Sequence, residues 1–243
     1  MINFVLIGLI QGIFEWLPIS SEGLVVLVSQ FFIKQVNPVE FALFLHLGTL
    51  LAVLIYFFKD WKNLLFLKDL KLLRFLIIAT LVSAIVGFLL YSLVINIVVG
   101  AGLLFLTGFG LLITAYFHKK KKHLEIKEDW LAVIVGLLQG LAVIPGVSRS
   151  GATIFGLSVK KDNPKEILTI SYLMSAPVVL GSGLLVYFKN PKPLLEAWPA
   201  LLVSFFVGLI SLKILLRISQ KINFFKFALI FSLLCFIGAF MLL

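Results

Sequence analysis

Two short segments hold most of the residues in this sequence that could do chemistry. The first begins at Gln11, and Glu15 follows four residues later, so both side chains lie on one face of a helix. Pro18 ends that helix, because proline disfavours the helical conformation in the residue before it. Ser20 and Ser21 then begin a second helix, where hydroxyls and backbone N–H groups favour an anion.

The second segment breaks at Pro145 and continues with Ser148, Arg149, Ser150 and Thr153. Hydroxyls beside an arginine at a helix N-terminus suit a phosphate group. The N–H groups and the helix dipole favour negative charge, and the planar guanidinium donates two parallel hydrogen bonds. This pattern predicts a phosphate-binding site.

The composition indicates what surrounds these segments. Of 243 residues, 61% are hydrophobic and 13% are charged, against roughly 45–50% and about 25% in soluble domains. Lipid must therefore solvate much of the chain. The net charge of +10 comes from lysines between apolar runs, which is typical of orientation signals rather than of nucleic-acid binding. The single cysteine, Cys235, cannot form an internal disulfide.

The sequence therefore predicts an all-α polytopic membrane protein with six transmembrane helices and two re-entrant helical hairpins. The six spans are 40–58, 72–95, 97–117, 166–188, 195–216 and 227–243. The hairpins, 2–33 and 131–158, are apolar at their ends but carry Pro, Gly, Ser and charge in the middle. Such broken backbone is tolerated at membrane depth only where protein or a wet cavity surrounds it.

An internal repeat supports two halves of opposite orientation. Residues 8–12 read GLIQG and residues 136–140 read GLLQG, and without gaps Ser20 aligns with Ser148. One hairpin and three spans give each half an odd number of crossings, so the second half enters from the opposite face. The glycine pairs also have the small-xxx-small spacing that lets helices pack closely. We expect a single membrane domain, 1–243, made of repeat 1 (1–117), a basic linker (118–130) and repeat 2 (131–243).

Basic residues predict the orientation. The loops on one side, including the linker with Lys119 to Lys122, carry most of the lysines and arginines. The positive-inside rule makes that side cytoplasmic and leaves both termini outside, in a multi-pass plasma-membrane protein.

Several roles stay open at this level. Glu15, facing the phosphate site, could hold a divalent cation or act as a base, or could form an ion pair with Arg149 that only stabilises the bundle. Ionisable groups inside a membrane are costly, which favours a functional role. Glu22 could lie in water at the mouth of the cavity. His46, within a predicted span, either points into the cavity or bonds to neighbouring backbone.

The two segments resemble the signature motifs of the undecaprenyl-diphosphate phosphatase family of the bacitracin-resistance type. The similar runs are QGIFEWLPISS at residues 11–21 and PGVSRSGATI at residues 145–154, with HLGT at 46–49 and SYLMSAP at 171–177 as secondary blocks. The resemblance covers essentially the whole chain. It implies hydrolysis of the terminal phosphate of a polyprenyl diphosphate, which regenerates the monophosphate lipid carrier for cell-envelope biogenesis.

The resemblance also implies roles for single residues. Glu15 matches a catalytic acidic position. The resemblance also implies a divalent cation, Mg²⁺ or Ca²⁺, for which Glu15 is the candidate ligand. Ser21 matches a nucleophile or phosphate contact, and Arg149 matches the phosphate-binding arginine. The expected substrate-binding residues are Gln11, Ser20, Ser148, Ser150 and Thr153.

Two positions depart from the family pattern. An acidic residue is usual where this chain has Gln11, and a histidine is usual where it has Leu24. The loss of an acid–base group lowers a rate by about 10²–10⁴-fold, and His46 is a candidate substitute. The alternative function is a transporter that flips polyprenyl phosphate lipids on the same inverted-repeat scaffold. The expected partners are the lipid substrate and the bilayer, with no nucleic acid, and a homodimer stays open.

Overall fold

The computed structural model describes residues 2–32, 37–94, 101–119, 125–144, 147–189, 191 and 196–241. Within these residues the fold is all helical. The helices are α1 (Ile2–Phe14), α2 (Ser21–Phe32), α3 (Pro38–Tyr56), α4 (Phe58–Leu65), α5 (Leu70–Val94), α6 (Ala101–Lys119), α7 (Glu128–Leu141), α8 (Arg149–Ser158), α9 (Pro164–Lys189), α11 (Trp198–Ser219) and α12 (Phe224–Met241). Pro145 and residues 120–124 of the basic linker lie outside the described residues.

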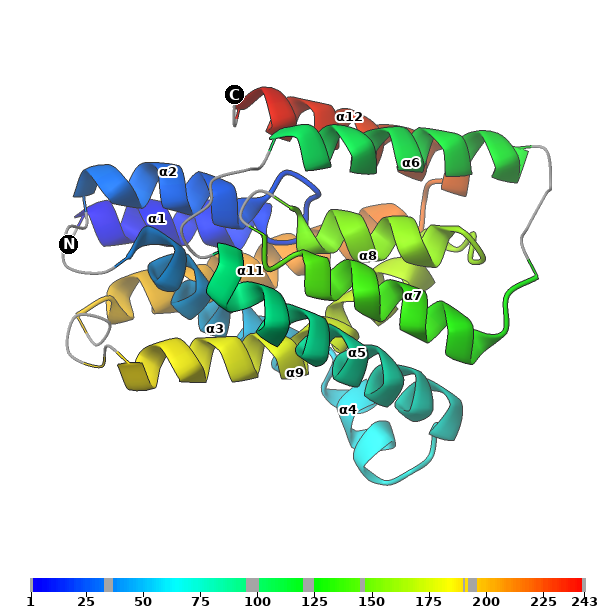
Figure 1. Cartoon of the computed structure of the whole chain (residues 1–243), viewed down its shortest axis with the longest axis horizontal. Coiled ribbons are helices and arrows are strands. Elements are labelled where there is room, and N and C mark those ends of the chain that lie inside the picture. Colours follow the sequence, from blue (N-terminus) through cyan, green and yellow to red (C-terminus); the bar gives the residue numbers. More distant parts are fainter. Residues whose placement is uncertain are drawn as a thin grey trace.

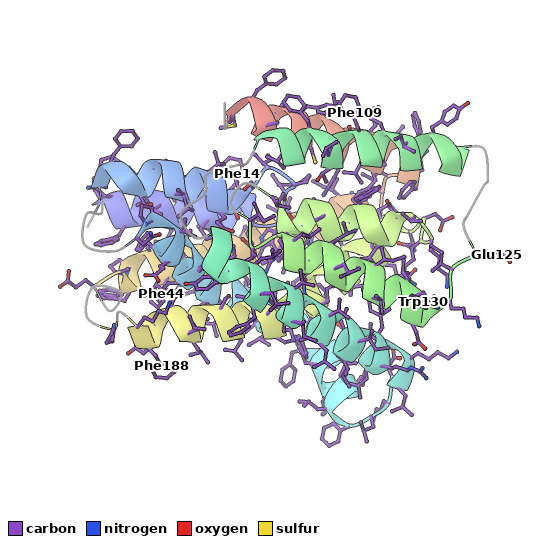
Figure 2. All side chains as sticks on the ribbon, viewed as in Figure 1. Phe14, Phe44, Phe109, Glu125, Trp130 and Phe188 are labelled. Atoms are coloured by element: carbon purple, nitrogen blue, oxygen red, sulfur yellow. The ribbon has the colours of Figure 1, made fainter. Side chains whose placement is uncertain are left out.

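Among the described residues, five helices are long and apolar enough to cross a membrane, namely α3, α5, α9, α11 and α12. They match five of the six predicted spans. The sixth, 97–117, corresponds to α6, whose described apolar stretch Leu104–Ile113 is shorter. Large apolar side chains cover the outside of the bundle, such as Phe109 on α6, Trp130 on α7 and Phe188 on α9 (Figure 2). The chain is a multi-pass membrane protein.

Helix α4 lies where the sequence predicts a basic loop after the first span. Within it, Trp61 and Leu64 are three residues apart and pack against the main core, whereas Phe58 and Leu65 are exposed. This apolar period of three residues gives a short amphipathic helix.

Each predicted hairpin is a pair of short helices joined by a turn. Helices α1 and α2 have 13 and 12 residues, and α7 and α8 have 14 and 10, or about 15–21 Å each. A hydrocarbon core is about 30 Å thick, so these helices are too short to cross it. Figure 1 shows the two pairs approaching each other end to end near the middle of the molecule.

The turn between α1 and α2 starts earlier than Pro18 alone would require, because α1 already ends at Phe14. Two of its backbone carbonyls accept hydrogen bonds from side chains of other helices. Tyr172 of α9 donates to the carbonyl of Trp16 (2.9 Å), and Ser150 of α8 donates to the carbonyl of Leu17 (3.0 Å). These bonds replace the intrahelical ones, as backbone shielded from water requires.

The glycine pairs pack closely, as predicted. A Cβ on Gly8 would lie 2.6 Å from the carbonyl oxygen of Ala200 on α11, and a Cβ on Gly136 would lie 2.7 Å from that of Ala79 on α5. The first helix of each pair therefore packs on a long helix from the other half of the chain. Helices α6 and α12 lie side by side along one edge (Figure 1), where Cys235 is a buried free thiol.

Candidate active site

Glu15 lies just beyond α1 and is the hydrogen-bonding centre of the site. Its side chain is 2% exposed. Gln11 Nε2 (2.8 Å) and Ser21 Oγ (2.9 Å) both donate to its Oε2. His46 Nε2 lies 3.1 Å from the same oxygen, and Arg149 Nη2 pairs with Oε1. The i, i+4 spacing of Gln11 and Glu15 thus gives the shared face that the sequence predicts, and both carboxylate oxygens are occupied.

The start of α8 presents the arginine. Ser148 is the N-cap residue, and its Oγ accepts from the N–H of Gly151 (3.1 Å) and lies 3.1 Å from Ser150 Oγ. This cap fixes the first turn of α8, so Arg149 projects from the positive end of the helix dipole. Its Nη1 is buried without a partner among the described residues. One arm of the guanidinium is therefore held by Glu15 and the other is available.

The start of α2 faces the same space. Ser20 has a positive φ of 67°, a conformation in which most residues are strained. Its Oγ accepts from the N–H of Gly23 at 3.3 Å, which begins α2 in the way that Ser148 begins α8. Two helix N-termini thus meet at one point, and both favour negative charge there.

A small pocket lies between the two turns. It is lined by Glu15, Ser20, Ser21 and Glu22 of the first pair, by residues 147–150 of the second, and by His46. Its volume is about 20 Å³, which holds about one water molecule. A diphosphate is larger, so groups that now touch across the pocket must separate before it can bind.

Two of the predicted substrate-binding residues do not line this pocket. Thr153 Oγ1 donates to the carbonyl of Arg149 (2.9 Å) and lies 2.6 Å from Ser171 Oγ, so it joins α8 to α9. Gln11 is fully buried and contacts Glu15 instead of the pocket. Both residues contact groups that line the pocket rather than lining it themselves.

The donor set around Glu15 does not fit a cation ligand there, because Gln11, Ser21, His46 and Arg149 already occupy its two oxygens. Among the described residues, no three His, Cys, Asp or Glu side chains are grouped so that they could hold a metal ion. Glu22 Oε1 is different, because it is a buried acceptor with no partner among the described atoms. Glu22 therefore fits a cation through one open oxygen.

His46 is the residue whose place the sequence left open. It both bonds to its own helix, through Nδ1 to the carbonyl of Ala42 (2.7 Å), and reaches Glu15. The roles of Trp16 and Tyr172 in holding the first turn were missed. Trp16 Nε1 donates to the carbonyl of Gly208 on α11 (3.0 Å), and Tyr172 lies within α9. The available signal was an indole and a phenol within apolar segments, since both need hydrogen-bond partners when buried.

The fold and site define a multi-pass membrane protein, all helical in its described residues, with a small polar pocket between two opposed helix starts. The model of the family described as bacitracin resistance protein BacA matches residues 4–237, and the chain belongs to this family. It is similar to the undecaprenyl-diphosphatase of Thermosipho africanus, with 38% identity over 93% of this chain and 94% of the relative. It is also similar to that of Haloarcula marismortui, with 34% identity over 96% and 95%, and to that of Methanopyrus kandleri, with 34% over 93% and 91%.

Proposed function

We propose that this chain hydrolyses undecaprenyl diphosphate to undecaprenyl phosphate and inorganic phosphate. The observation that carries the proposal is the buried meeting of Glu15 and Arg149 beside two helix N-termini. A membrane-embedded phosphate site with a carboxylate and a hydroxyl in contact suits a lipid whose headgroup is a diphosphate. The names of the relatives agree with this substrate.

Binding requires an exchange at Arg149. The free Nη1 is the first donor available to the terminal phosphate, and the N–H groups at the starts of α2 and α8 add to it. Because the pocket is too small for the headgroup, the phosphate takes the second arm of the guanidinium from Glu15. The entering anion replaces the carboxylate in a bidentate pair with Arg149, and Glu15 Oε1 is released.

The chemistry then needs a nucleophile and a base within contact. Ser21 already donates its proton to Glu15 Oε2 at 2.9 Å, so Glu15 is placed to accept a proton from Ser21 or from a water in its place. Arg149 and the helix starts neutralise the charge that develops on the phosphoryl oxygens. Most of the catalysis is positioning and charge stabilisation, as is usual for phosphoryl transfer.

We also propose a divalent cation, Mg²⁺ or Ca²⁺, held by Glu22 and the diphosphate rather than by Glu15. Such an ion neutralises phosphate charge when bound, and Mg²⁺ typically uses one or two carboxylates together with substrate phosphates. Glu22 lines the pocket as an acidic group, where its carboxylate would otherwise repel the substrate.

The finer architecture belongs to the same proposal. We infer six spans and two re-entrant hairpins in two inverted repeats, 1–117 and 131–243. The packing of α1 on α11 and of α7 on α5 supports this. In each case the first helix of one repeat packs on a long helix of the other repeat. We place this multi-pass chain in the plasma membrane with both termini outside and the linker 118–130 cytoplasmic. Single cysteines introduced at residues 121 and 189, and labelled from each face of the membrane, would test this orientation. A homodimer stays a prediction.

The test uses the full chain reconstituted in liposomes with undecaprenyl diphosphate and Mg²⁺. We expect inorganic phosphate and undecaprenyl monophosphate in equal amounts, and an Arg149→Ala control should give neither. The family names do not favour the transporter alternative. Movement of undecaprenyl phosphate between leaflets without any phosphate release would support that alternative and contradict hydrolysis.

A further inference from the structure

The imidazole of His46 is held in one orientation by its own helix. Nδ1 lies 2.7 Å from the carbonyl oxygen of Ala42. A carbonyl oxygen only accepts hydrogen bonds, so Nδ1 carries a proton and donates it. With Nδ1 engaged in this way, Nε2 is the nitrogen that points toward the pocket.

Nε2 faces a carboxylate oxygen, Glu15 Oε2, at 3.1 Å. Two lone pairs cannot face each other at that distance in a buried site, so a proton lies between the two atoms. This proton is additional to the one on Nδ1. Gln11 Nε2, Ser21 Oγ and Arg149 Nη2 all donate to the Glu15 carboxylate, and hydrogen bonds to the charged form stabilise it. The proton therefore resides on Nε2, and His46 is an imidazolium.

We propose that His46 is the general acid of this site and delivers its Nε2 proton to the oxygen that leaves the terminal phosphorus. This inference rests on the proposed function. The apolar, buried Leu24 cannot carry a proton, and among the described residues that line the pocket His46 is the one imidazole. A histidine reaching the pocket from α3 thus supplies the proton carrier that α2 lacks.

The proton inventory closes over one turnover. A water attacks the terminal phosphorus, and the bond from that phosphorus to the bridging oxygen breaks, with its electron pair remaining on the bridging oxygen. His46 Nε2 gives its proton to that oxygen, and Glu15 Oε2 takes one proton from the attacking water. The proton on Glu15 returns to His46 Nε2, so the pair again holds one. If Ser21 attacks first, the same transfers give phosphoserine, and a water then hydrolyses it and restores the hydroxyl proton.

The charged groups near His46 come from the pocket and not from the helices packed behind it. The charged side chains that line the pocket with His46 are Glu15, Glu22 and Arg149. The helices α9 and α11 meet α3 beside His46 through uncharged contacts, Gly183 against Leu47 and Ser204 against Gly48. The buried Tyr172 of α9 donates to backbone instead of to the imidazole. The pH response of the site therefore depends on His46 and the two carboxylates.

The first test compares wild type with His46→Gln in the purified full-length protein. Glutamine retains an amide N–H that can reach Glu15 but cannot transfer a proton. We expect kcat to fall by about 10²-fold or more, with KM changed by less than about threefold, because the variant loses proton transfer and not binding. The wild-type kcat should fall as alkaline pH removes the Nε2 proton, and this alkaline limb should be missing in the variant. His118→Gln, on α6, is the matched control and should behave as wild type.

An unchanged kcat and pH profile in His46→Gln, with wild type active, would overturn the assignment of His46 and leave the proposed function standing. If wild type itself released no phosphate, the proposed function would fail, and a second measurement would still decide the state of His46. In ¹⁵N spectra of histidine-labelled protein at neutral pH, the signals absent from His46→Gln should show both ring nitrogens protonated. A bare Nε2 would contradict the proposal.

Discussion

Arg149, the first residue of α8, pairs with Glu15, the residue after α1, across 134 positions of sequence. Their side chains are 17% and 2% exposed. One arm of the guanidinium contacts the carboxylate, and Nη1 has no partner among the described atoms. The pair therefore joins the two hairpin tips and leaves a donor for a ligand.

The pair can be separated into a structural and a functional part. Arg149→Met alone leaves Glu15 buried without its strongest partner, which should lower the free energy of unfolding by roughly 3 kcal/mol. The double variant Glu15→Gln/Arg149→Met removes both charges and should recover most of the melting temperature. Phosphate release should stay absent in both variants. Recovery of activity in the double variant would show that the pair only stabilises the bundle.

The close packing of the hairpins predicts opposite effects for two glycines. Gly136→Ala places a Cβ 2.7 Å from the carbonyl oxygen of Ala79, so α7 must move away from α5 and the melting temperature should fall. Gly181→Ala, on α9, meets nothing within 4 Å and should be neutral or stabilise by about 0.5–1 kcal/mol. Thermal unfolding in detergent measures both. Equal responses would mean that the α5–α7 contact is looser than described.

Ser21 should be needed for turnover. Ser21→Ala removes the hydroxyl that donates to Glu15 at 2.9 Å, and phosphate release should fall by about 10²-fold or more. The control is Ser29→Ala on the same helix, whose hydroxyl donates to the carbonyl of Val26 at 3.2 Å. Acid quenching with ³²P-labelled lipid then distinguishes attack by Ser21 from attack by water. Label on Ser21 identifies this residue as the nucleophile. Wild-type rates in Ser21→Ala would remove Ser21 from the mechanism.

Glu22 should set the affinity for the cation. Mn²⁺ binding, followed by electron paramagnetic resonance in the presence of a non-hydrolysable diphosphate lipid, should weaken by about tenfold or more in Glu22→Gln. Glu166→Gln is the control, because Glu166 does not line the pocket. Its Oε1 instead pairs with Lys161 Nζ at a distance of 2.8 Å. If Glu22→Gln binds Mn²⁺ as wild type does, another residue holds the cation.

The sequence predicts the hairpin breaks because proline, glycine and clustered hydroxyls act locally. Five spans follow from hydropathy in the same way, and the glycine spacing predicts the close helix contacts. The end of α1 at Phe14 could not be predicted, because it depends on Tyr172 and Ser150 reaching the turn from elsewhere in the chain. The contact of Thr153 with Ser171 also depends on how α8 packs on α9, which the sequence does not show.

The contribution of His46 illustrates the same limit. From sequence it is a histidine within an apolar span, and neither its spacing nor its neighbours distinguish a packed side chain from a reactive one. Only the packing of α3 against the first hairpin brings Nε2 to 3.1 Å from Glu15. Position 24 is a leucine and carries no proton. A histidine elsewhere in the sequence, His46, can therefore lie beside Glu15 in its place.

The most direct test of the account is the rate of phosphate release from undecaprenyl diphosphate by purified wild type and Arg149→Ala, measured side by side with Mg²⁺. The account predicts steady release by wild type and a loss of about 10³-fold or more in the variant, as expected when a guanidinium that stabilises phosphoryl charge is removed. Release at equal rates by both proteins, or no release by wild type, would contradict it.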